Sequence, residues 1–157
     1  MSSDSPFMRR AIELARKGMT AGHGGPFGAV VVRDGEIIGE GWNQVLRNND
    51  PTAHGEVTAI RDACSKIDNF HLADCEIHTT GEPCPMCLGA IYWSRIRRIY
   101  YGFSIKDAAA IGFDDVDFYS ELVLPAEKRS VPSLQSHADE ARILLSDYKA
   151  IPNRSGY

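Results

Sequence analysis

The apolar positions at the start of the chain recur at the spacing of an amphipathic helix. Four of them fall on one face of such a helix: Met8, Ile12, Ala15 and Met19. Ser5 precedes Pro6, and these residue types favour the N-cap and the first turn of a helix, respectively. The pattern therefore predicts a helix over residues 6–20.

A continuous apolar run after a glycine-rich loop predicts a β-hairpin. The loop at residues 21–26 leads into the apolar run at 27–32, and a shorter apolar run follows at 36–39. Between the two runs stands Asp34-Gly35, a strong signal for a two-residue turn between antiparallel strands. We therefore expect the first two strands to be antiparallel neighbours.

Helix and strand patterns then alternate. Val57, Ile60 and Cys64 mark one face of a helix that should begin near His54. A strand around residues 76–79, a helix at about 85–93 and a strand at 98–101 follow. Such an alternation implies a right-handed crossover between parallel strands, with helices covering the sheet. The predicted fold class is α/β, with a central mixed sheet between helices.

The pattern after residue 101 is weaker. A short helix is expected at residues 106–112, and a polar helical pattern is present near 136–149. Three prolines, at positions 125, 132 and 152, interrupt this part of the chain. No change in composition marks a second domain, so we expect a single domain over residues 1–157.

Composition and charge narrow the class of protein. The 157 residues are 43% apolar and 24% charged, which is typical of a globular domain that buries a core. The net charge of −4 favours a small neutral substrate and makes nucleic acid an improbable partner. The chain has neither the apolar segment of a signal peptide nor 18 consecutive apolar residues. We therefore expect a cytoplasmic protein with no membrane partner.

Two short motifs carry the residue types of a metal site. His54-Gly55-Glu56 is followed by Pro83-Cys84-Pro85-Met86-Cys87. In a reducing compartment, a Cys-x-x-Cys pair indicates metal binding rather than a disulfide. Both motifs stand at predicted helix starts, where backbone N–H groups and the helix dipole favour thiolates. We expect His54, Cys84 and Cys87 to bind one zinc ion.

Three protein ligands leave an open position on a tetrahedral zinc ion. A water molecule bound there becomes a usable nucleophile at neutral pH. Glu56 stands two residues after His54, so it should lie beside the metal without binding it. It is therefore the candidate general base and acid. The combination of H-x-E with P-C-x-x-C is the signature of zinc deaminases of nucleobases.

At these motifs the chain resembles the cytidine-deaminase-like zinc superfamily. Further stretches are similar to its bacterial guanine deaminase branch: residues 24–30, 48–54, 82–93 and Gly112-Phe113-Asp114-Asp115. The resemblance implies a three-layer sandwich fold, one Zn²⁺ per subunit and no organic cofactor. It also implies hydrolysis of guanine to xanthine and ammonia, in which Glu56 moves protons between water, a ring nitrogen and the leaving amine.

The resemblance also implies substrate-binding residues. Asn43 should hydrogen-bond the purine, and Asp115 should accept hydrogen bonds from the edge that bears the amino group. Phe27 and Trp93 should pack against the ring. Each of them also has a structural interpretation: Asn43 in a turn, Phe27 in the core, and Trp93 between layers. Of the two adjacent aspartates, Asp114 is interpreted as a solvated or capping residue.

The resemblance implies, in addition, a homodimer. The C-terminal segment, about residues 120–157, would cross to the partner subunit, where Tyr157 would touch the substrate. Without the resemblance, a frayed terminus is the ordinary expectation for the last residues of a chain.

Three alternative functions stay open. Deamination of adenosine in transfer RNA shares the zinc motif, and Arg95, Arg97 and Arg98 form a basic cluster. Guanosine, cytosine or a triazine such as ammeline would also suit a pocket that differs by a few contacts. A non-catalytic zinc module would need a fourth ligand, and the sequence offers none in an obvious place.

Overall fold

The computed structural model describes residues 5–157 of the chain. Two compact units are present, one ending at Tyr119 and one comprising Ser120–Tyr157. The second unit begins where the C-terminal segment is expected to begin. The exchange of this segment between subunits remains a prediction.

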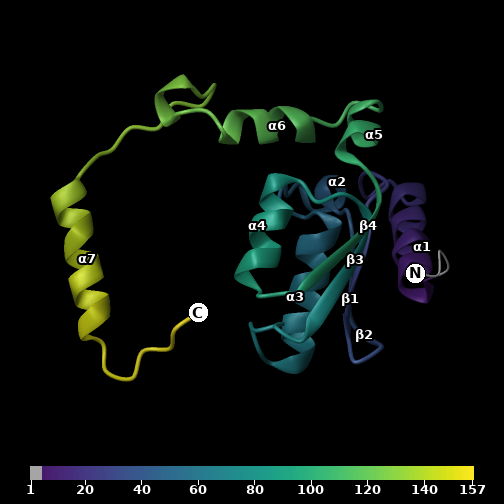
Figure 1. Cartoon of the computed structure of the whole chain (residues 1–157), viewed down its shortest axis with the longest axis horizontal. Helices are drawn as coiled ribbons and strands as arrows, with labels where there is room; N and C mark the ends of the chain where they lie inside the picture. The colour runs from purple at the N-terminus through teal and green to yellow at the C-terminus, as the bar shows by residue number, and fades with distance from the viewer. Residues whose placement is uncertain (1–4) are drawn as a thin grey trace. The chain divides into compact units, whose positions relative to one another are not determined.

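The first unit is built on a four-stranded mixed sheet (Figure 1). Its strands, in the order β2-β1-β3-β4, are β1 (Gly28–Arg33), β2 (Glu36–Trp42), β3 (Cys75–Gly81) and β4 (Arg98–Phe103). Strand β1 is antiparallel to both β2 and β3, whereas β3 and β4 are parallel. The hairpin turn has positive φ at both Asp34 and Gly35, as a type I′ turn requires. The predicted hairpin and crossover are thus confirmed.

Helices cover both faces of this sheet (Figure 1). Helix α1 (Pro6–Thr20) lies on one face, where Leu14 packs with Val30 and Val32. Helices α3 (Gly55–Ile67) and α4 (Pro85–Trp93) lie on the other face and enclose the larger apolar cluster. The side chain of Ser5 accepts a hydrogen bond from the Met8 N–H, as expected of the N-cap. The α/β three-layer prediction is confirmed.

Short helices were the weakest part of the sequence prediction. Helix α2 (Val45–Asn48) is not predicted, and the helix expected at 106–112 is shorter, α5 (Ile105–Ala109). A separate helix, α6 (Asp115–Leu122), follows. Helices of one or two turns have too few positions to establish a period. In α5, for example, the reciprocal hydrogen bonds of Ser104 and Asp107 set the start.

The second unit contains the turn η1 (Ala126–Lys128) and helix α7 (Ala138–Ala150). The bounds of α7 agree with the polar helical pattern near 136–149. No residue of α7 is buried. Within residues 5–157, none of the helices is both long enough and apolar enough to cross a membrane.

Candidate zinc site

Strands β2, β3 and β4 end, and strand β1 begins, at the same end of the sheet. Gly28 at the start of β1 pairs with Trp42 at the end of β2, and Gly81 at the end of β3 pairs with Phe103 at the end of β4. The residues that follow or precede these ends therefore lie close together. In open α/β sheets this is where ligands bind, beyond the carboxyl ends of parallel strands.

His54, Cys84 and Cys87 come together at this end of the sheet. The Nδ1 atom of His54 lies 3.6 Å from Sγ of Cys84 and 3.4 Å from Sγ of Cys87. The three ligand atoms all lie within 4.8 Å of one another, and no fourth His, Cys, Asp or Glu of residues 5–157 belongs to the group. The predicted ligand set is thus assembled in space.

These distances fit a zinc ion. Zinc bonds of about 2.3 Å to sulfur and about 2.0 to 2.1 Å to nitrogen, at a tetrahedral angle, place the two ligand atoms about 3.6 Å apart. The two observed nitrogen–sulfur separations agree with this value. Two thiols and one imidazole are also ligands that zinc prefers.

The zinc ligands stand at the starts of two helices, where a thiolate is favoured over a thiol. Cys84 is the N-cap of α4, and His54 is the N-cap of α3. Hydrogen bonds from Cys87 and then from His54 lower the pKa of Cys84 to about 4, against the opposing effect of burial. The pKa of the Cys87 thiol is raised, first because the thiol donates its hydrogen bond to Cys84, then because it is buried, and further because negative charges on Glu56 and Cys84 are near.

Glu56 stands in the first turn of α3 and is 3% exposed. Burial is the main reason why the pKa of this carboxyl is raised, and the neighbouring Cys84 thiolate adds to the effect. A carboxyl group whose pKa is raised accepts a proton more readily than an ordinary carboxylate does, as a group that carries protons must. Its position and chemistry therefore agree with the role expected from the sequence.

Two of the ligands, His54 and Cys84, line a small cavity. The six other residues of its lining are Phe27, Asn43, Glu56, Glu82, Phe113 and Asp115. The cavity measures about 30 Å³. That volume accommodates about one or two water molecules. Only the reacting edge of a larger molecule would enter it.

Asp115 and Phe27, which are expected to contact the substrate, both line the cavity beside the zinc ligands. Asp115 is buried, whereas Asp114 is exposed, which agrees with the preference for Asp115. Burial and the nearby Cys84 thiolate raise the pKa of Asp115. The ring of Phe27 meets the ring of Phe113 edge to face, with 4.8 Å between centroids. Together the two rings form an apolar wall of the cavity.

Asn43 makes a hydrogen bond within a turn and also lines the cavity. It is 4% exposed, and its Oδ1 accepts a hydrogen bond from the Val45 N–H. That bond identifies the other side-chain atom as the NH₂ group, which remains as a donor. Gly24 makes room for this side chain, because a Cβ at position 24 would lie 1.9 Å from Oδ1 of Asn43.

Two predicted substrate residues lie outside this cavity, and two of its lining residues were missed. Trp93 is 65% exposed at the end of α4, and Tyr157 belongs to the second unit. Both roles stay predictions. Glu82 and Phe113 were not assigned a role from the sequence, although both fall within stretches that carried the resemblance. Their adjacency to Cys84 and to Asp115 was the available signal.

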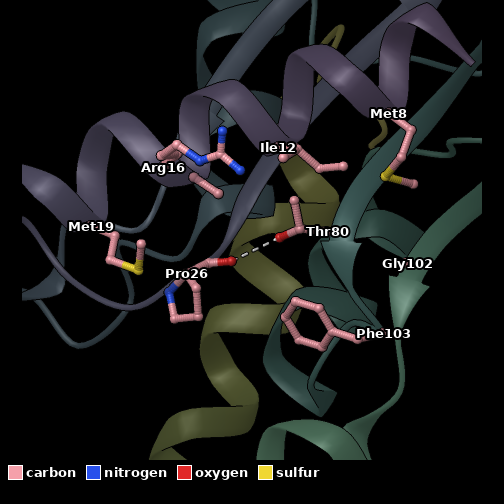
Figure 2. A pocket seen from close by; sticks show the side chains of 9 residues that line it. Met8, Ile12, Arg16, Met19, Pro26, Thr80, Gly102 and Phe103 are labelled. Carbon is pink, nitrogen blue, oxygen red and sulfur yellow. Dashed lines mark hydrogen bonds between the residues drawn. The ribbon is translucent and has the colours of Figure 1, made fainter.

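A larger cavity beside α1 has different chemistry (Figure 2). It measures about 320 Å³, and its lining includes Met8, Ile12 and Phe103. Arg16 is the charged residue of this lining. The hydroxyl of Thr80 donates a hydrogen bond to the carbonyl of Pro26 and accepts one from the N–H of Gly28. Because its lining residues offer neither metal ligands nor a carboxyl group, we place the reaction at the smaller cavity.

Comparisons with known proteins agree with this site. Residues 1–103 match the family described as the cytidine and deoxycytidylate deaminase zinc-binding region. A guanine deaminase of Bacillus subtilis is 49% identical over 96% of this chain and 97% of its own length. A tRNA-specific adenosine deaminase of Haemophilus influenzae is 46% identical over 71% of this chain and 68% of its own.

The fold agrees as well. The crystal structure of the Bacillus subtilis guanine deaminase superposes with a TM-score of 0.92, at 49% identity and 96% coverage of both chains. A guanine deaminase of Nitrosomonas europaea superposes with a TM-score of 0.67, at 32% identity over 94% of this chain and 86% of that one. The chain belongs to the cytidine and deoxycytidylate deaminase family of zinc-binding proteins.

Proposed function

We propose that the protein hydrolyses guanine to xanthine and ammonia. One observation carries the proposal: a group of three zinc ligands, with no fourth among the described residues, borders through His54 and Cys84 on a cavity that buried Glu56 and Asp115 also line. A structural zinc site is closed by four ligands, whereas a catalytic site keeps one position open. The similarity to guanine deaminases over nearly the whole chain supports the choice of substrate.

His54, Cys84 and Cys87 would hold the zinc ion, which when bound would make a water molecule a nucleophile near neutral pH. Glu56 would carry two protons in turn: the first from the attacking water to the ring nitrogen, and the second from the new hydroxyl group on C2 to the amine, which leaves as ammonia. The balance is one water consumed, one C–O bond formed at C2 and one C–N bond broken. A buried carboxyl with a raised pKa suits both directions of transfer.

The other lining residues would hold the purine. Asp115 would accept hydrogen bonds from the N–H groups of the edge that bears the amine. The NH₂ group of Asn43 would donate to an acceptor on the ring, and Phe27 would pack against it. Since the enclosed cavity is small, the ring would lie at its mouth, where Trp93 remains a candidate contact.

The Gly24→Ala variant tests the Asn43 contact. The added Cβ displaces Oδ1 of Asn43, so we expect kcat/KM for guanine to fall about 10- to 100-fold, with unchanged zinc content. Gly89→Ala is the matched control, because a Cβ there meets nothing within 4 Å. Steady-state kinetics of both variants check the prediction. Equal kinetics for the two would remove Asn43 from the site.

We also propose that the protein is a homodimer in which the C-terminal segment of each subunit, including Tyr157, completes the partner's site. Helix α7 supports this, because Leu144, Leu145 and Tyr148 are exposed within one helical stripe. A helix gains most of its stability from packing its apolar side. Light scattering should give twice the mass of one chain. A monomer with full activity would contradict the proposal.

Deamination of adenosine in transfer RNA is the second candidate, since an enzyme of that kind is 46% identical over part of the chain. The position of the basic cluster, Arg95, Arg97 and Arg98, argues against transfer RNA as the substrate. Arg98 is the first residue of β4, and Arg95 and Arg97 precede it, whereas the site lies beyond the last residue of that strand. An anticodon loop at the site would therefore not meet these arginines.

A substrate panel tests the proposed function. Ammonia release by the zinc-loaded protein should be measured with guanine, guanosine, adenine, cytosine, cytidine, ammeline and an adenosine-containing anticodon stem-loop. We expect guanine to have the highest kcat/KM. Turnover of another member alone would overturn the substrate and keep the chemistry. Zinc binding without turnover of any member would favour a non-catalytic zinc module.

A further inference from the structure

The segment that carries Asp115 is separate in sequence from the segment that carries the cysteine ligands. Asp115 begins α6, whereas Cys84 is the N-cap of α4 and Cys87 lies in its first turn, and strand β4 and helix α5 lie between α4 and α6. A hydrogen bond from Asp115 to a substrate serves the reaction only if its carboxylate is held in register with the metal ligands. Specific contacts between the two segments must set that register.

Both ends of the segment from Ile105 to Tyr119 are attached to the same dipeptide. At its start, the N–H of Ile105 donates to Oε2 of Glu82 at 3.1 Å. At its end, the hydroxyl of Tyr119 donates to the carbonyl oxygen of Pro83 at 2.8 Å. Glu82 and Pro83 directly precede Cys84. The two attachments therefore join the Asp115 segment to the loop that presents the first thiolate.

The second attachment acts closest to Asp115. Tyr119 follows Asp115 by four residues in α6, so the two side chains stand on the same face of that helix. Pro83 is buried and Tyr119 is half-buried, so the bond between them is partly shielded from water. Holding Tyr119 against Pro83 therefore turns the Asp115 face of α6 toward Cys84.

We infer that Tyr119 is a positioning residue of the reaction, whose hydroxyl ties α6 to Pro83 and so fixes the Asp115 carboxylate beside the zinc ligands. The inference rests on the proposed function for its effect on turnover. Tyr119 itself is not among the residues that line the cavity, so it acts through Asp115. Nothing in this role requires a contact between Tyr119 and the substrate.

A double-mutant cycle separates positioning from general stability. We expect Tyr119→Phe to lower kcat/KM for guanine about tenfold, mainly through a higher KM, with zinc retained. In the Asp115→Asn background the same substitution should change kcat/KM by less than about twofold, because the group that it positions is already altered. Tyr101→Phe is the control, since Tyr101 is 50% exposed on β4.

Hydrogen exchange supplies a readout that needs no turnover. Amides of residues 105–119 should exchange faster in Tyr119→Phe than in the wild type, while those of the central strands stay unchanged. Unchanged exchange and unchanged kinetics would overturn the inference, and so would an equal loss of kcat/KM in both backgrounds. Faster exchange in a protein whose wild type ignores guanine would support the tether and overturn the proposed substrate.

Discussion

The Glu56→Gln variant is expected to lose about 10³-fold in kcat for guanine while it keeps its zinc ion and its fold. The amide has nearly the shape of the carboxyl group but cannot accept a proton from water or deliver one to the amine. Because Glu56 is a buried carboxyl with a raised pKa, its replacement by a neutral group should not lower the melting temperature.

Three measurements check this result: ammonia release, zinc content by atomic absorption and thermal unfolding. Glu36→Gln is the matched control, because Glu36 is exposed at the turn end of the hairpin, opposite the site. It should behave as the wild type does. If Glu56→Gln kept normal turnover, another group would have to carry the protons and the assignment of Glu56 would be wrong.

The Cys84→Ala variant is expected to lose the metal as well as the activity. Loss of even a group that only orients a ligand weakens metal binding about 10- to 100-fold, so removing one of three ligands should cost at least about 100-fold in zinc affinity. The melting temperature should fall too, since an ion that binds only the folded state stabilises it. Zinc content, titration with a zinc chelator and calorimetry report these effects separately.

Cys64→Ala is the control for this variant. Cys64 lies on α3 and is a free cysteine outside the ligand group. Its replacement should leave the zinc content at one ion per chain. Full zinc occupancy in purified Cys84→Ala would show that the ion binds elsewhere, and it would remove the basis of the proposed chemistry.

Local patterns predicted the elements whose stability is decided locally. Helix α1 has an N-cap, a proline in its first turn and four apolar residues on one face, and it forms over the predicted residues. The hairpin turn needs two residues that tolerate positive φ, and Asp34-Gly35 provides them. The candidate zinc ligands could also be predicted from the sequence, because His54 and Cys84 each stand at the start of a helix that the sequence predicts.

The lining of the site required the tertiary structure. Asn43, Phe113 and Glu82 enter one cavity because the sheet order β2-β1-β3-β4 brings the ends of distant strands together. That order depends on hydrogen bonds between residues far apart in sequence, which no local period reports. The short helices α2 and α6 depend in the same way on contacts beyond their own residues.

By itself, the sequence determined the main helices and the hairpin, and it predicted a set of zinc ligands and a proton carrier, because spacing and capping act over a few residues. The tertiary structure alone decided three things. It buried Asp115 and left Asp114 exposed, it made Gly24 the neighbour of Asn43, and it joined Tyr119 to Pro83. Each of these three outcomes depends on how whole helices and strands pack against one another. No short stretch of residues encodes that packing.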